Sequence, residues 1–156
     1  MQKELLTNEQ LRLAVEKKWI EHIKLCQDNF IYFVKEVWPD FICRLDPNPK
    51  KWGHHQHIAS EFTKISDTKK GRLIINMPPR HTKSEFASFL FPAWMIGKYP
   101  NLKIMQVSHN AELSSRFGSK VRNLMEQREY KNIFGDVKLR EDSKAKGRWE
   151  TNHGGE

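Results

Sequence analysis

The stretch that most constrains this chain is residues 72–96, RLIINMPPRHTKSEFASFLFPAWMI. An apolar run rich in β-branched residues ends in two prolines, a short polar loop closes in Lys83 and Ser84, and a segment with helical apolar spacing follows. A strand, a loop and a helix in this order are typical of a phosphate-binding loop. Met77 and Thr82 stand where the pattern GxxxxGK[ST] has glycine, so only Lys83 and Ser84 match it.

The residue types in this loop suit a nucleotide. A helix beginning at Ser84 would direct free N–H groups and its positive dipole end at the loop. Lys83 would contact the β- and γ-phosphates, Ser84 would offer a hydroxyl to Mg²⁺, and Arg80 would add a guanidinium. The alternative is a strand-turn-helix corner with a solvated lysine, and the pattern alone leaves both open. Thr82 is β-branched, so a positive φ at this position would strain it.

Composition sets wider limits. A chain of 156 residues has the size of one domain, and its net charge of +8 suits DNA, RNA or a polyphosphate ligand, although such a charge also serves solubility. Cys26 and Cys43 are too few for a disulfide framework, and no apolar run approaches membrane-spanning length. We therefore expect a soluble, cytoplasmic protein with no membrane partner.

Residues 1–50 are predicted to form an N-terminal helical arm and a loop. Thr7 and Gln10 form a capping-box pattern before a helix. An apolar stripe, either a packing face or a docking face for a partner, recurs at every fourth position: Leu11, Val15, Trp19 and Ile23. A second helix follows Asp28-Asn29 and should stop at Pro39.

Residues 51–156 are predicted to form a second unit, the core. A helix at residues 58–65 precedes an apolar strand at 73–76, and a second apolar strand at 102–107 precedes a helix at 111–126. Alternating strands and helices predict an α/β fold with a parallel sheet. Pro92 should kink the helix after the loop, and Gly97 suits its C′ position. After Tyr130 only a possible strand at 148–151 is indicated.

Three histidines precede the first strand: His54, His55 and His57. No cysteine or carboxylate lies at ligand spacing around them, which disfavours a metal site. Gln56 lies among them, and its amide could read both edges of an adenine. The alternative for Gln56 is an exposed polar helix start.

Five segments together resemble the N-terminal ATPase part of a tailed-phage terminase large subunit. They are DNFIYFVKEVWPDF, WGHHQHIA, LIINMPPRHTKSEFASFLFPAWMIGKYP, VSHNAELSSRFG and GRWETNHGGE, and they span residues 28–156 with gaps. The combination of PPRHTKS, FPAW and SHNAEL is far more specific than a bare phosphate loop.

The resemblance implies a P-loop NTPase-type parallel sheet in an ATP-driven motor that moves double-stranded DNA into a procapsid. It implies ATP and Mg²⁺ as cofactors, the portal protein and the terminase small subunit as partners, and the cytoplasm of a bacterial host cell as location. By motif position it assigns Arg80 and Lys83 to catalysis and Ser84 to the metal ion. Cofactor binding is assigned to Gln56, Arg80, His81, Thr82, Lys83, Ser84 and Glu85.

The chain departs from this family in two ways. Thr82 replaces the glycine that usually precedes the lysine, and no apolar strand ending in paired acidic residues follows Lys83. We therefore expect residues 51–156 to be a partial P-loop ATPase core, part of a truncated chain without the acidic strand and the nuclease domain, and its catalytic competence stays open. The alternatives are another P-loop NTPase, such as a small kinase, and a non-enzymatic basic adaptor or DNA-binding remnant.

Overall fold

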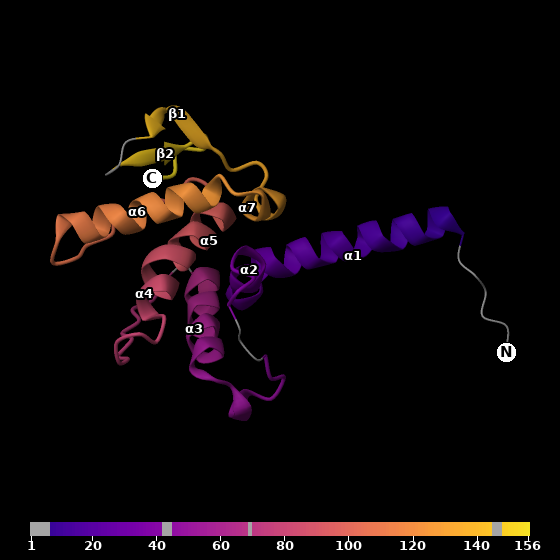
Figure 1. The fold of residues 1–156 in the computed structure, drawn as a ribbon, viewed down its shortest axis with the longest axis horizontal. Helices are drawn as coiled ribbons and strands as arrows, with labels where there is room; N and C mark the ends of the chain where they lie inside the picture. Colours follow the sequence, from indigo (N-terminus) through magenta and orange to yellow (C-terminus); the bar gives the residue numbers. More distant parts are fainter. Residues whose placement is uncertain (1–6, 42–44, 69, 145–147) are drawn as a thin grey trace.

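The computed structural model describes residues 7–41, 45–68, 70–144 and 148–156, and these are mostly helical (Figure 1). Two helices, α1 (Asn8–Asp28) and α2 (Phe30–Val37), come first, and a 3-10 turn, η1 (Pro49–Lys51), leads to α3 (His54–Thr68). A continuous helical run then combines α4 (Lys83–Glu85), the π-helical turn η2 (Phe86–Leu90) and α5 (Phe91–Lys98). The remaining elements are α6 (Ala111–Met125), α7 (Arg128–Ile133), β1 (Leu139–Lys144) and β2 (Trp149–Thr151).

The expected α/β fold with a P-loop NTPase-type parallel sheet is wrong. Among the described residues the only sheet is the antiparallel pair β1–β2, in which Leu139 lies opposite Thr151. The segments predicted as core strands, 73–76 and 102–107, belong to no strand of the structure. A parallel strand needs neighbours for its N–H and C=O groups. Among the described residues, the segment 102–107 makes a single bridge of this kind: Ile104 N donates to Glu156 O (2.7 Å), and Glu156 N donates to Leu102 O (3.0 Å).

The core is a cluster of aromatic rings centred on Phe30, which is fully buried. Its ring centroid lies 5.3 Å from that of Phe62 in α3 and 5.6 and 5.5 Å from those of Phe86 and Trp94 in the helical run. Aromatic pairs at these distances add to the burial of apolar area. Because α2 contributes the central ring, the core contains residues from both sides of residue 50, where the arm was expected to end.

The sequence signals at the starts of α1 and α2 are confirmed. Thr7 and Gln10 form the capping box of α1, and the Asn29 side chain caps α2 by accepting from Ile31 N. α1 extends away from the other helices (Figure 1). Its stripe is only partly covered, since Val15 is 68% and Trp19 45% exposed.

Pro92 shapes the helical run in a way the sequence did not predict. It lies at the start of α5, directly after the π-helical turn. In place of the expected kink, the run changes there from a π-helix to an α-helix. Proline donates no hydrogen bond to the carbonyl of Ser88, and the Gln106 side-chain amide donates to that carbonyl instead. Gly97 is not a C′ residue: it lies inside α5, against the ring of Phe134.

The C-terminal part contains the small sheet. β2 confirms the possible strand at 148–151, whereas α7 and β1 had no clear sequence signal. Tyr130 of α7 is fully buried and its hydroxyl donates to Ala93 O (2.9 Å), which fixes α7 to α5. Within the part of the chain that the structure describes, no helix has both the length and the apolarity to cross a membrane.

Candidate functional site

The loop before the helical run has an unusual backbone. Arg80 has a φ of 65° and Thr82 a φ of 58°, while His81 between them is not in the positive-φ region. Alternation of this kind turns successive N–H groups toward one side and forms a concavity suited to an anion. The first helical residue is Lys83, one position before the predicted start. The positive φ considered for Thr82 is confirmed.

The polar side chains of the loop differ in exposure. Arg80, His81 and Ser84 are exposed, whereas Lys83 is half-buried. The Lys83 ammonium donates to Met77 O (3.3 Å), which holds it beside the segment that enters the loop. The loop residues 78–85 together line a shallow pocket. The structure therefore brings together six of the predicted residues, namely Arg80, His81, Thr82, Lys83, Ser84 and Glu85.

Thr82 is tied to the first turn of α3. Its hydroxyl donates to His81 O (2.7 Å), so the His55 ring, with Nε2 at 2.7 Å from Thr82 Oγ1, is the donor to that oxygen. Burial, together with the neighbouring His54 and His81, lowers the pKa of His55 to about 4. His55 is therefore neutral at pH 7, in the tautomer that carries its proton on Nε2.

The loop histidine joins those of α3. The ring centroids of His54 and His55 lie 3.8 Å apart, and those of His54 and His81 lie 5.9 Å apart. These rings add donors beside the loop. Among the described residues, the group with the geometry to hold a metal ion contains none of these three histidines.

The carboxylate of Glu85 is already engaged. Both of its oxygens accept from Lys120 Nζ of α6, at 2.7 and 2.9 Å. Each of the two side chains is about one-third exposed, so the pair joins α4 to α6 at the surface. Glu85 thus fixes the direction of the helical run that leaves the loop.

Gln56 does not line the loop pocket. Its side-chain oxygen accepts from Asp46 N (3.0 Å), and its amide nitrogen donates to Asp46 O (3.2 Å). Trp52 Nε1 donates to the same carbonyl (2.7 Å). The two ends of the Gln56 amide thereby clamp the segment before η1, and Gln56 lines a separate pocket between α2 and α3.

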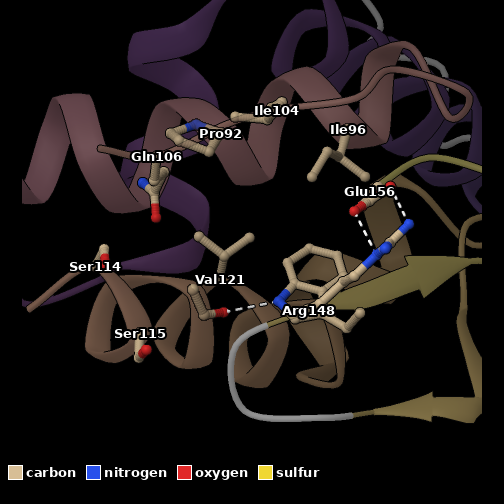
Figure 2. Close-up of a pocket in the computed structure, with 11 residues that line it drawn as sticks. Pro92, Ile96, Ile104, Gln106, Ser114, Ser115, Val121, Arg148 and Glu156 are labelled. Carbon is tan, nitrogen blue, oxygen red and sulfur yellow. Dashed lines mark hydrogen bonds and ion pairs between the residues drawn. The ribbon is translucent and has the colours of Figure 1, made fainter. Parts of the chain in front are cut away.

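Another pocket lies among α5, α6, the 102–107 segment and β2 (Figure 2). Arg148 and Glu156 project into it and pair with each other, with Arg148 Nε at 2.6 Å from Glu156 Oε1. Trp149 also lines the pocket and donates from Nε1 to Gly118 O (3.2 Å). Because its two charged side chains neutralise each other, this pocket offers less to an anionic ligand than the loop does.

Two contacts of the loop were missed by sequence reasoning. The HHQH run bears on a metal site and does not indicate the hydrogen bond from His55 to Thr82. The pairing of Lys120 with Glu85 has no signal in the sequence because it depends on how α6 packs.

No protein-family model matches this chain, and neither a curated protein nor a solved structure matches it.

Proposed function

We propose that the loop at residues 80–84 binds the phosphates of a nucleoside triphosphate, with ATP and Mg²⁺ as the ligands that the resemblance implies. The observation that carries this proposal is the loop backbone. Arg80 and Thr82 both have positive φ, a backbone alternation of the kind that turns N–H groups toward an anion, and they lie directly before a continuous helical run that spans 83–98. Arg80 and Lys83 supply the positive charge of the same loop.

Each side chain has a distinct part in this proposal. Arg80 is exposed and contacts the outer phosphate oxygens bidentately. Lys83 exchanges the Met77 carbonyl, a neutral acceptor, for the β- and γ-phosphates. Ser84 is exposed and offers its hydroxyl to Mg²⁺. His81 and Thr82 complete the rim of the loop, and Glu85 holds the helix in place through Lys120.

Adenine recognition makes a separate demand. The resemblance assigns Gln56 to the base, and its amide now uses both ends on the backbone of Asp46. To read adenine, the Gln56 amide must give up its two hydrogen bonds to the Asp46 backbone and form an equivalent pair with the base. Replacing Gln56 by alanine should then weaken ATP binding more than GTP binding.

At the level of the assembly, we propose that the chain is part of the ATP-driven motor that packages double-stranded DNA, a terminase large subunit, in the cytoplasm of a bacterial host. Double-stranded DNA, the portal protein and the terminase small subunit are its proposed partners. The net charge of +8 supports the DNA partner. Binding to duplex DNA should weaken steeply as salt is raised, because phosphate contacts release counterions.

The decisive experiment is a calorimetric titration of Mg-ATP into the wild-type chain, Lys83→Ala and Lys138→Ala. Lys138 is an exposed lysine directly before β1, so its variant makes the same charge change away from the loop. A charge-assisted hydrogen bond contributes about 1.5–3 kcal/mol, so Lys83→Ala should bind at least about tenfold more weakly. Lys138→Ala should bind as the wild type does. Equal affinities for Mg-ATP in the three proteins would refute the proposal.

A second candidate function, a non-enzymatic adaptor, is favoured by the exposed stripe of α1. Leu11, Val15 and Trp19 are 46%, 68% and 45% exposed, which is unusual for apolar residues that share one helix face. An adaptor would bind its partner with the same affinity in the presence and absence of Mg-ATP. Its binding would also survive Lys83→Ala.

A further inference from the structure

Three side chains with metal-binding atoms meet between α1 and α2. His22 and Cys26 lie four residues apart, on one face of α1, and Glu36 faces them from α2. His22 Nε2 is 2.9 Å from Glu36 Oε2 and 3.7 Å from Cys26 Sγ. The three ligand atoms all lie within 4.8 Å of one another.

We propose that His22, Cys26 and Glu36 form a Zn²⁺ site that joins α1 to α2. Nitrogen, thiolate sulfur and carboxylate oxygen are the three ligand types that zinc uses in proteins. Three protein ligands leave the fourth tetrahedral position to water or to a group from a partner.

The distances fit a tetrahedral ion with small side-chain adjustments. Zn–N, Zn–S and Zn–O bonds of ordinary length place tetrahedral ligand atoms about 3.4–3.6 Å apart. The spacing of 3.7 Å between Cys26 Sγ and His22 Nε2 is only slightly longer than this. Glu36 must move its oxygen away from His22 Nε2, now at 2.9 Å, and toward Cys26 Sγ, which lies within 4.8 Å. A rotation about the χ angles of this partly exposed glutamate would make both changes.

The site is fixed on its inner side and open on its outer side. Cys26 is fully buried, and its carbonyl accepts from Trp94 Nε1 (2.9 Å), a side chain of the core. The side chains of His22 and Glu36 are 39% and 26% exposed, so an ion has access from solvent. One face is therefore preorganised, as a selective metal site requires.

The charges also balance. A Cys26 thiolate and a Glu36 carboxylate neutralise Zn²⁺, and a neutral His22 completes the set. Burial, together with the charge of Glu36, raises the pKa of the Cys26 thiol to about 12. The thiol proton leaves to solvent when the ion binds, as it does when thiolates bind zinc in general.

A bound ion would determine how α1 is presented. The hydrogen bond between His22 and Glu36 crosses the interface between α1 and α2. Coordination replaces it with metal–ligand bonds from both helices, which fixes the angle at which the exposed part of α1 leaves the core. The inference does not depend on the nucleotide proposal, because the two sites share no residue.

Cobalt substitution tests the site. Co²⁺ is added to the reduced chain in a buffer with a phosphine reductant that does not compete for metal. We expect one equivalent of Co²⁺ to give ligand-field bands of tetrahedral intensity and a thiolate-to-cobalt charge-transfer band, and one equivalent of Zn²⁺ to abolish them. A chain that gives no charge-transfer band has no site of the proposed kind.

Variants identify the ligands. Cys26→Ser should abolish the charge-transfer band, whereas Cys43→Ser, which removes the other thiol, should retain it. Cys43 lies outside the described residues. His22→Gln and Glu36→Gln should each weaken Zn²⁺ binding more than about a hundredfold in a chelator competition, because loss of an outer partner alone costs about 10- to 100-fold. His54 lies in α3, near His81 of the loop, and serves as the control. The His54→Gln variant should bind Zn²⁺ at this site as tightly as the wild type.

Because Cys26 is buried, Cys26→Ser could lose the band by unfolding, and His22→Gln avoids this at a more exposed position. Circular dichroism confirms that each variant is helical before titration. A band that survives His22→Gln and Glu36→Gln with unchanged affinity, or that disappears in Cys43→Ser, would overturn the assignment.

Discussion

Replacing Gly97 by alanine should destabilise the chain, although alanine is the better helix former. Gly97 lies inside α5, and the ring of Phe134 packs directly over its Cα. A Cβ at this position would lie 2.6 Å from two ring carbons of Phe134 and closer still to a third. Carbon atoms in contact prefer a separation of about 3.5–4.0 Å, so the ring would have to retreat by about 1 Å.

The surroundings of Phe134 decide the magnitude. Phe134 is 5% exposed, and its ring centroid lies 5.2 Å from that of Tyr130 and 5.9 Å from that of Phe33, both of which are fully buried. Overpacking of a core costs about 1–3 kcal/mol, and the better helix propensity of alanine returns at most about 1 kcal/mol. Since the overlap exceeds that of a single well-placed methylene, we expect a net loss of about 1–2 kcal/mol.

Urea denaturation followed by tryptophan fluorescence measures this change. Gly118→Ala in α6 is the matched control, because its Cβ would lie 3.9 Å from its nearest neighbour, Trp149 Nε1, an ordinary contact. This variant should keep the propensity gain and be more stable by up to about 1 kcal/mol. If Gly97→Ala unfolds at the same urea concentration as the wild type or a higher one, the packing of Phe134 over α5 is not as described.

Three further predictions concern the loop and the unpaired segments. The pKa of His55 is about 4 in the folded chain and ordinarily 6.5, so the unfolded chain binds more protons between these pH values. The stability should therefore fall as pH drops from 6.5 to 4, and urea denaturation of His55→Gln across this range should show a smaller fall. Thr82 has a positive φ in this structure, so its strain is a cost of folding and not of binding. Thr82→Gly should therefore bind Mg-ATP within about twofold of the wild type in calorimetry, and a tenfold gain in affinity would refute this. Ile74 and Val107 are each 84% exposed on segments that belong to no strand, so the chain should self-associate. Val107→Lys should then lower the sedimentation coefficient at equal concentration, and an unchanged coefficient would contradict self-association through this segment.

Short-range patterns were reliable guides to helices. The capping box at Thr7, the cap at Asn29 and the apolar spacing of 111–126 each predicted a helix end or a helix that the structure contains. These signals depend on hydrogen bonds and side-chain spacing within a few residues, so no distant segment has to be known. The loop residues 80–82 follow from the same kind of local pattern, although the helix begins at Lys83, one residue before the predicted start.

The fold class failed because it depends on distant partners. Residues 73–76 and 102–107 have the composition of buried parallel strands, but a strand is completed by hydrogen bonds to its neighbours, and no described segment supplies a full ladder. Periodicity describes one segment at a time and says nothing about pairing. The buried aromatic cluster around Phe30 likewise joins α2, α3 and the helical run across long sequence separations.

The sequence by itself determined the starts of α1 and α2 and the polar residues that precede Lys83, whereas the C′ position predicted for Gly97 was wrong. Only the tertiary structure decided that His55 holds Thr82, that Lys120 engages Glu85 and that Gln56 clamps Asp46. It also decided that His22, Cys26 and Glu36 meet. Local backbone energetics act through adjacent residues, whereas the partner of a side chain is set by the packing of helices that are far apart along the chain.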